Sequence, residues 1–355
     1  MKAAPVMAAL AERNSVSQIL VHTGQHYDEN MSNVFFGQLG LPQPDLDLGV
    51  GSGTHARQTA SIMMRMEEVL MDDRPDLLLV YGDVNSTVAA ALTCAKLLIP
   101  IGHVEAGLRS FDRGMPEEVN RLITDQLSDL LFTPSRDGDE NLLREGIAKE
   151  KIHFVGNVMI DTLVRLRKAA LEDVVRNQLE EKHTFLADVL RDRYGLVTLH
   201  RPSNVDDPDT LSKITGTLQL ISEGLPIVFA VHPRTRRRLA DMNMESSHPG
   251  LFLIDPVGYL EFLFLQHNAA VVITDSGGIQ EETTFLHVPC LTVRENTERP
   301  VTVDVGTNTV VGLDFGRLRR EVDKILRGDA KKGEIPPLWD GKAGERIAAI
   351  ITARG

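Results

Sequence analysis

A series of short, continuously apolar runs constrains the fold of this chain more than any other feature. The runs are QILVHTG, DLLLVYGD, IPIGHVEA, LLFTPS, KIHFVGN, LVTLH, IVFAVHP, LFLIDPV, AVVITDSGG and PCLTV. Unbroken apolar runs are typical of strands buried on both faces of a parallel sheet, and longer helical patterns separate them here. The pattern therefore predicts an α/β fold. Nearly every run ends in glycine or polar residues, and parallel sheets bind ligands at the carboxyl ends of their strands.

The runs fall into two groups, which predicts two domains. A chain of 355 residues with 42% hydrophobic content suits two domains of ordinary size. Between the groups, residues 161–193 are rich in charge and contain no strand-like run, so we expect exposed helices there. We expect an N-terminal domain over residues 1–168, a C-terminal domain over residues 169–335, and a closing helix within residues 336–355. Because the chain opens on a helical pattern, the N-terminal domain is expected to lack its first strand.

Charge and composition exclude several classes of partner. The formal net charge of −12 disfavours binding to nucleic acid or to an anionic membrane. No window is apolar for long enough to span a bilayer, and the N-terminus lacks the features of a signal peptide. The two cysteines, Cys94 and Cys290, lie in apolar runs, where buried thiols are expected rather than a disulfide. These features predict a cytoplasmic protein.

Carboxylates follow two of the strands predicted in the first half. Asp83 ends DLLLVYGD, where it could accept a proton or bind a sugar hydroxyl, or else cap the next helix together with Ser86. His103 and Glu105 would share one face of an extended strand, so they could line one pocket or bind one metal ion. Glu117 falls in the first turn of the helix that Pro116 opens, where compensation of the helix dipole is the simpler explanation.

The second half offers groups suited to a phosphate. His200 ends the run LVTLH and Arg201 follows it, so the two could bind a diphosphate, although a satisfied histidine at a domain junction is the competing interpretation. In AVVITDSGGIQEE, the segment from Ser276 to Gly278 predicts a tight turn into a helix, whose backbone N–H groups could bind phosphate. Glu282, one turn later, could accept the ribose hydroxyls. A plain glycine turn remains the alternative, and neither a dinucleotide fingerprint nor a Walker loop is present.

Six motifs together give the chain a family resemblance. In order, HVEAGLRS, PEEVNR, GNVMID, LHRPSN, DSGGIQEE and ENTERPVTVDVGTN are similar to those of the non-hydrolysing UDP-N-acetylglucosamine 2-epimerases, over nearly the whole chain. The resemblance implies two Rossmann-like, doubly wound domains in the GT-B fold, with the active site in the interdomain cleft. It further implies a UDP-sugar substrate, no metal ion or other cofactor, a homodimer, and a C-terminal helix that crosses back to the first domain.

The resemblance also implies a mechanism and a set of residues. UDP is eliminated across C1 and C2 of the sugar and then added back to 2-acetamidoglucal, which requires proton transfer at C2 and stabilisation of the departing UDP. The implied catalytic residues are Asp83, Glu105, Glu117 and His200, and which carboxylate acts as the C2 base stays open. The implied UDP-binding residues are Lys2, Arg109, Arg201, Ser276, Gly277, Gly278, Glu282 and Arg299.

One departure from the family concerns the start of the chain. Relatives begin with a strand and a Gly-Thr-Arg-Pro-Glu loop, of which this sequence retains only the following helix, with Lys2 at the position of the family's lysine. We therefore expect the natural protein to be longer. Three other functions remain open: a hydrolysing epimerase, a GT-B glycosyltransferase, and an inactive UDP-sugar-binding protein. The carboxylates of the first half favour proton abstraction at carbon over glycosyl transfer.

Overall fold

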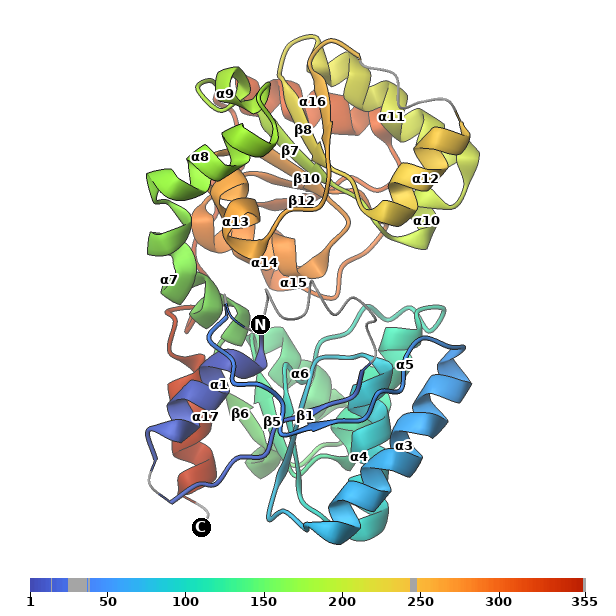
Figure 1. The fold of residues 1–355 in the computed structure, drawn as a ribbon, viewed down its shortest axis with the longest axis vertical. Coiled ribbons are helices and arrows are strands. Elements are labelled where there is room, and N and C mark those ends of the chain that lie inside the picture. The colour runs from blue at the N-terminus through green and yellow to red at the C-terminus, as the bar shows by residue number, and fades with distance from the viewer. Residues whose placement is uncertain (14, 25–36, 38, 243–247, 354–355) are drawn as a thin grey trace. The chain divides into compact units, whose positions relative to one another are not determined.

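The computed structural model of the protein describes residues 1–13, 15–24, 37, 39–242 and 248–353. The chain divides into two compact units (Figure 1). Unit 1 comprises residues 1–164 together with 337–355, and unit 2 comprises residues 165–336. Each unit is built around its own parallel sheet, which confirms the predicted α/β class.

The main sheet of unit 1 has four parallel strands in the order β3-β4-β5-β6. A separate parallel pair, β1-β2, includes β2, which the sequence did not predict because it is two residues long and exposed. The strands are β1 (Val21–His22), β2 (Leu46–Asp47), β3 (Leu78–Tyr81), β4 (Ile101–Val104), β5 (Leu130–Thr133) and β6 (Ile152–Phe154). The helices are α1 (Ala3–Ala11), α3 (His55–Asp72), α4 (Asn85–Leu97), α5 (Pro116–Leu127), α6 (Arg136–Arg144), a 3₁₀ turn (Lys149–Lys151), α7 (Val158–Ala170), which runs on into unit 2, and α17 (Ala343–Thr352).

Both faces of the unit 1 sheet are buried. Val104 and Phe132 pack with apolar residues of α1, α7 and α17 on one face. Val80 and Ile101 pack with α3 and α4 on the other face. Residues next to one another in a strand point to opposite faces, so burial on both sides requires the unbroken apolar runs seen in the sequence.

The C-terminal helix α17 belongs to unit 1 and lies beside α1 (Figure 1). Their approach is close, because a Cβ atom on Gly344 would lie 2.7 Å from the carbonyl oxygen of Pro5. Asp161 of α7 accepts hydrogen bonds from the backbone N–H groups of Ala343 (3.1 Å) and Gly344 (2.7 Å). A side chain distant in sequence therefore satisfies the first amides of α17.

Unit 2 contains a six-stranded parallel sheet in the order β12-β11-β10-β7-β8-β9. Its strands are β7 (Gly195–Thr198), β8 (Ile227–Ala230), β9 (Leu251–Ile254), β10 (Val271–Thr274), β11 (Cys290–Thr292) and β12 (Asn308–Val310). Its helices, after α7, are α8 (Asp173–Lys182), α9 (Leu186–Val189), α10 (Pro202–Val205), α11 (Pro208–Ser222), α12 (Pro233–Asp241), α13 (Tyr259–Asn268), α14 (Gly277–Leu286), α15 (Pro300–Asp304) and α16 (Phe315–Leu326). The short edge strand β12 was not predicted from the sequence.

Helices cover both faces of this sheet (Figure 1). Val197 and Phe229 pack with α11 and α16 on one face, while Leu196 and Val228 pack with α8, α9 and α13 on the other. The strand order reverses between β7 and β10, and ligands of open α/β sheets bind at such a reversal, outside the carboxyl ends of the strands. Within the described residues, no helix is long and apolar enough to cross a bilayer.

Candidate active site

In unit 1, Asp83 follows β3 and is held by a buried arginine. Arg121 of α5 is almost fully buried, and its Nη1 atom lies 2.5 Å from Oδ2 of Asp83. Asn120 donates a hydrogen bond to the Asp83 carbonyl oxygen at 2.8 Å. The N-cap residue of α4 is Val84, whose side chain makes no capping hydrogen bond. The capping interpretation of Asp83 is therefore wrong, and its carboxylate forms an ion pair instead.

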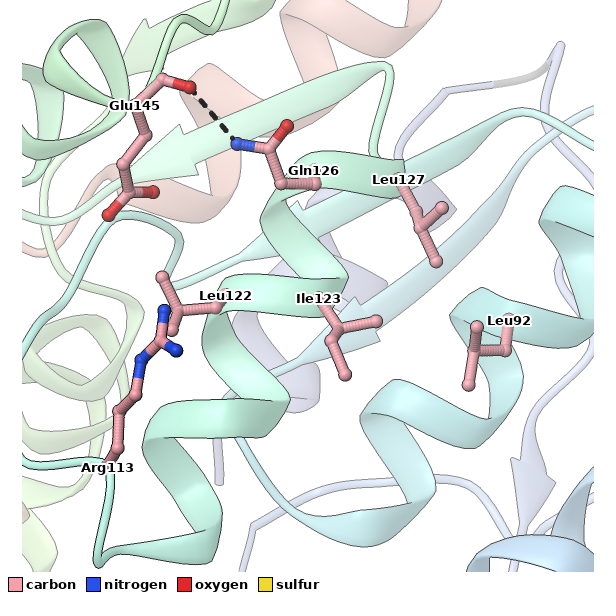
Figure 2. Close-up of a pocket in the computed structure, with 7 residues that line it drawn as sticks. All are labelled: Leu92, Arg113, Leu122, Ile123, Gln126, Leu127 and Glu145. Carbon is pink, nitrogen blue, oxygen red and sulfur yellow. Dashed lines mark hydrogen bonds between the residues drawn. The ribbon is translucent and has the colours of Figure 1, made fainter.

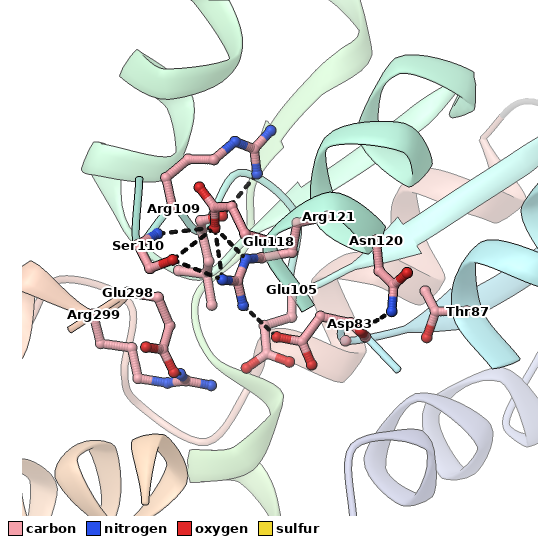
Figure 3. A network of polar contacts seen from close by, with 12 residues as sticks. Asp83, Thr87, Glu105, Arg109, Ser110, Glu118, Asn120, Arg121, Glu298 and Arg299 are labelled. Carbon is pink, nitrogen blue, oxygen red and sulfur yellow. Dashed lines mark hydrogen bonds and ion pairs between the residues drawn. The ribbon is translucent and has the colours of Figure 1, made fainter. Parts of the chain in front are cut away.

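The same arginine is fixed on its other side by Glu118 (Figure 3). Glu118 accepts from Arg121 Nη2 at 2.6 Å and from the backbone N–H groups of Ser110 (3.0 Å) and Phe111 (2.9 Å). Burial alone would raise the pKa of Glu118, but these N–H donors and the arginine charge lower it. Glu118 is therefore an ionised buried carboxylate that fixes both Arg121 and the loop after β4.

Glu105 is, after Asp83, the second of the carboxylates predicted at a strand end of unit 1. Strand β4 ends at Val104, and Glu105 has a φ of 75°, a left-handed conformation that non-glycine residues seldom adopt. Its carboxylate forms an ion pair with Lys2. A Cβ atom on Gly82 would lie 3.3 Å from Glu105 Oε2, so the loops after β3 and β4 touch. The structure thus brings the loop that carries Asp83 to the carboxylate of Glu105.

His103 does not share the environment of Glu105, because the strand alternation that the sequence indicated stops at Val104. The His103 ring is fully buried, with Nδ1 2.6 Å from Asp125 and Nε2 2.8 Å from the carbonyl oxygen of Gly82. Both ring nitrogens are thus engaged inside the unit. Among the residues that the structure describes, no group of three histidine, cysteine or acidic side chains is arranged to bind a metal ion.

Arg109 is also directed into unit 1. Its guanidinium contacts Asp125 at 2.7 Å, Glu145 at 2.6 Å and the Leu108 carbonyl oxygen at 2.7 Å. Burial raises the pKa of Asp125 less than His103 and Arg109 lower it, so this carboxylate stays ionised. The role of Arg109 as a UDP ligand stays a prediction. Glu117 lies beside Glu118 in the first turn of α5 and is partly exposed.

In unit 2, the loops after β7 and β10 are joined by Asp275. This fully buried carboxylate lies 3.0 Å from Nδ1 of His200 and accepts the backbone N–H of Arg201 at 2.9 Å. The sequence analysis missed Asp275. A signal was present, since it is the first polar residue after β10, at the strand end where ligand sites form.

The segment from Ser276 to Gly278 opens α14, as predicted. The first N–H groups of a helix have no partner within the helix and carry the positive end of its dipole. Arg299 lies against this turn, because a Cβ atom on Gly277 would fall 2.2 Å from its Nη1 atom. The arginine also pairs with Glu281 (2.9 Å) and with Glu298.

Glu298 is a buried carboxylate that lies close to three arginine side chains. Arg294 lies 2.7 Å and Arg201 3.8 Å from its carboxylate, in addition to Arg299. Burial raises the pKa of Glu298, but the arginine charges outweigh it and hold the pKa far below its usual range. The buried carboxylate thus gathers three guanidinium groups next to the turn that opens α14.

Glu282 lies on α14 next to Glu281 but has a different environment. It is buried, and the hydroxyl of Tyr259 donates to its Oε1 atom at 2.9 Å. Burial raises the pKa of Glu282 to about 7, more than the Tyr259 hydrogen bond lowers it. Whether this carboxylate accepts ribose hydroxyls stays a prediction.

An apolar depression of about 500 Å³ in unit 1 includes Glu145, the partner of Arg109, in its lining (Figure 2). It is lined by Leu92, Arg113, Leu122, Ile123, Gln126, Leu127 and Glu145. None of the predicted site residues lines it. A second depression, beside α3 and the start of α5, contains Met63 and Val119.

Comparisons with known proteins place this architecture in a known group. Residues 8–352 match the family described as UDP-N-acetylglucosamine 2-epimerase. A UDP-N-acetylglucosamine 2-epimerase of Methanocaldococcus jannaschii is 45% identical over 99% of this chain and 95% of the relative. A UDP-2,3-diacetamido-2,3-dideoxy-D-glucuronate 2-epimerase of Pseudomonas aeruginosa is 43% identical, again over 99% of this chain and 95% of the relative.

Solved structures agree with this result. The crystal structure of the Methanocaldococcus jannaschii UDP-GlcNAc 2-epimerase in complex with UDP-GlcNAc and UDP matches with a TM-score of 0.90 at 44% identity, covering 99% of this chain and 96% of that one. The UDP-GlcNAc 2-epimerase of Neisseria meningitidis bound to UDP-GlcNAc matches with a TM-score of 0.90 at 29% identity, with the same coverage.

Proposed function

The chain belongs to the UDP-N-acetylglucosamine 2-epimerase family, and from this premise we propose that it interconverts UDP-N-acetylglucosamine and UDP-N-acetylmannosamine. It is an isomerase of nucleotide sugars with the GT-B-like fold of its relatives. The observation that carries the reaction is the pair of neighbouring loops in unit 1. Asp83 and Glu105 follow adjacent strands, and each carboxylate is ion-paired with a cation.

The proposed reaction proceeds by elimination and readdition. A base removes the proton from C2, the electron pair forms the C1–C2 double bond, and the C1–O bond breaks to release UDP. UDP then adds back to 2-acetamidoglucal while an acid returns a proton to the opposite face of C2. We assign these proton transfers to Asp83, Glu105 and Glu117 as a group.

The nucleotide would be bound by unit 2. The α14 N-terminus at Ser276, Gly277 and Gly278 supplies N–H donors for phosphate, and Arg201 and Arg299 supply positive charge beside it. His200 would stabilise the diphosphate as it departs. Glu282 would accept the ribose hydroxyls. Lys2 would reach the substrate from beside Glu105, whereas the buried contacts of Arg109 fit support of the loop after β4 better than ligand contact.

Incubation with UDP-N-acetylglucosamine in heavy water tests the proposal. Epimerisation introduces deuterium at C2 and yields UDP-N-acetylmannosamine, which NMR detects directly. A hydrolysing epimerase would release free N-acetylmannosamine, a glycosyltransferase would leave C2 unlabelled, and an inactive binding protein would be stabilised by UDP without turnover. The diacetamido-glucuronate nucleotide should be assayed in parallel, because a relative that is 43% identical is an epimerase of that sugar.

We further propose that the protein is a homodimer and that it acts in the cytoplasm. Leucine and isoleucine side chains on α4 and α5 line the apolar depression of Figure 2, with Arg113 and Glu145 among them. Such a surface, apolar with both charge signs, suits pairing with a second copy. Light scattering of the protein and of Ile123→Glu would test this. The two free, buried cysteines suit a reducing compartment.

A further inference from the structure

Asp275 receives an unusual number of hydrogen bonds for one side chain. Its Oδ2 atom accepts from the backbone N–H groups of His200 (3.1 Å) and Arg201 (2.9 Å) and from Nδ2 of Asn204 (3.0 Å). Its Oδ1 atom lies 3.0 Å from Nδ1 of the His200 ring. The Nε atom of Arg201 donates to the Asp275 carbonyl oxygen at 3.1 Å. One buried residue therefore fixes the backbone and both side chains of the loop after β7.

The contact with Oδ1 determines which nitrogen of His200 carries a proton. Burial raises the pKa of Asp275, but the His200 ring and the N–H donors around it outweigh burial and lower the pKa. An ionised carboxylate has no proton to donate, so Nδ1 must be the donor. The Nε2 atom is then the nitrogen left for a ligand, on a side chain that is 45% exposed.

We propose that Asp275 is a positioning residue for the reaction: it fixes His200 with Nδ1 protonated and presents Nε2 to the diphosphate. When the ring carries both protons, Nε2 can donate to a phosphate oxygen while Nδ1 donates to Asp275. The proposal rests on the proposed function only in naming the diphosphate as the ligand of His200. The arrangement of the ring itself follows from contacts within unit 2.

The substitution Asp275→Asn tests the assignment because it reverses the polarity of one atom. The amide oxygen can replace Oδ2 and keep its three N–H donors, so the only backbone contact of the loop that is lost is the longer one from His200 N–H to Oδ1 (3.2 Å). The amide NH2 group then faces Nδ1 of His200, and it can only donate. Nδ1 must therefore accept, and the proton moves to Nε2.

The experiment compares ¹⁵N chemical shifts of the His200 ring in the wild-type protein and in Asp275→Asn. The signals are assigned by their loss in His200→Gln and recorded at about pH 9, where an ordinary imidazole is neutral. We expect Nδ1–H in the wild-type protein and Nε2–H in the variant. UDP affinity, measured by calorimetry at neutral pH, should fall by about 10–100-fold in the variant, by analogy with the loss of an outer partner of a metal-ligating histidine.

Two controls separate positioning from general structural support. Asn204→Ala removes a donor to Oδ2 but leaves the Oδ1 contact, so it should lower the melting temperature without moving the His200 proton. Asp314→Asn alters another acceptor of a backbone N–H in the same unit, far from His200 in sequence. It should change neither the position of the His200 proton nor the UDP affinity. A wild-type spectrum with the proton on Nε2 would overturn the proposal even if Asp275→Asn failed to fold.

Failure of the proposed reaction and failure of the positioning role would give different results. If the heavy-water assay shows no epimerisation while the His200 shifts and UDP affinity respond as expected, the proposed reaction is wrong and the role of Asp275 stands. If epimerisation occurs but the ring keeps its proton on Nδ1 in Asp275→Asn, the positioning role is wrong and the reaction stands.

Discussion

The two units bury opposite members of the ion pairs near their strand ends. In unit 1 the cation is buried and the carboxylate reaches outward: the Arg121 side chain is 2% exposed and its partner Asp83 is 26% exposed. In unit 2 the carboxylate is buried and the cation reaches outward: Asp275 is fully buried and His200 is 45% exposed. The pairs Arg109–Glu145 in unit 1 and Glu298–Arg201 in unit 2 follow the same two patterns.

This inversion shows how each unit presents one sign of charge to a ligand. A buried ion that has lost its partner is costly, so in each unit the buried member of the pair holds a more exposed partner of opposite charge beside it. Unit 1 can therefore offer bases, and unit 2 can offer positive charge to a diphosphate. The pair Lys2–Glu105 departs from the pattern, because here the carboxylate is the more buried partner. Glu105 should consequently depend on Lys2 more than Asp83 depends on any exposed group.

The largest expected effect comes from removing the two carboxylates of unit 1 that are assigned to proton transfer. Asp83→Asn and Glu105→Gln keep the shape of each side chain but remove its basicity. Each should lower kcat by roughly 10²–10⁴-fold, the usual contribution of a general acid or base. UDP affinity should change little in Asp83→Asn, because the nucleotide is assigned to unit 2. Initial rates and calorimetry measure the two quantities.

Glu140→Gln is the matched control for these variants. Glu140 belongs to unit 1 and forms only an exposed ion pair with Arg144, so the substitution should leave kcat unchanged. A kcat for Asp83→Asn within about threefold of that control, far short of the contribution expected of a general acid or base, would mean that the ion pair with Arg121 is structural and that unit 1 contributes no base at this position.

The next effect is on stability and concerns the buried cation itself. Arg121→Met leaves Glu118 buried without its guanidinium, so the free energy of unfolding should fall by about 3–5 kcal/mol. Arg144→Met, which breaks the exposed pair with Glu140, should cost about 1 kcal/mol or less. Denaturant unfolding compares the two. Equal losses would show that the burial of the cation, on which the contrast between the units depends, has no energetic consequence.

The sequence predicted the positions of the outward groups but not their partners. Strand ends are visible as apolar runs that stop at polar residues, which placed Asp83, His200 and the Ser276 turn correctly in the chain. Their partners lie far away along it: Arg121 is 38 residues from Asp83, and Asp275 is 75 residues from His200. Such pairings depend on which strands are neighbours and in what register, and no local pattern encodes that.

A local turn explains why the prediction that His103 and Glu105 share one face is wrong. Alternation along an extended strand placed His103 and Glu105 on one face, but β4 ends one residue before Glu105, whose φ is positive. The sequence gives no warning of this turn, because glutamate is not a residue that favours it. The turn separates His103, whose two ring nitrogens are engaged inside the unit, from Glu105, which pairs with Lys2, and only the folded backbone distinguishes them.

The smallest expected effect is a pH dependence of stability caused by Glu282, a carboxylate of unit 2 whose pKa is raised rather than lowered. Burial raises the pKa of Glu282 from 4.5 to about 7, unlike the lowered pKa values of Asp275 and Glu298. Between these two pH values the unfolded chain ionises and the folded protein does not, so stability falls as pH rises and the loss persists above pH 7. The loss is roughly 3 kcal/mol at about 1.4 kcal/mol per pKa unit. Glu282→Gln should remove this dependence, whereas the surface variant Glu321→Gln should keep it.

Ligand binding gives this exception its functional meaning. Ribose hydroxyls donate hydrogen bonds, so they favour the ionised form of Glu282, and bound nucleotide should be stabilised as pH rises through 7. UDP phosphate also titrates in this range, but it does so equally for the wild-type protein and for Glu282→Gln. The ratio of their UDP affinities therefore isolates the carboxylate. A ratio that stays constant from pH 6 to pH 8 would place the ribose elsewhere and leave Glu282 as a buried acid of unit 2 that accepts a hydrogen bond from Tyr259.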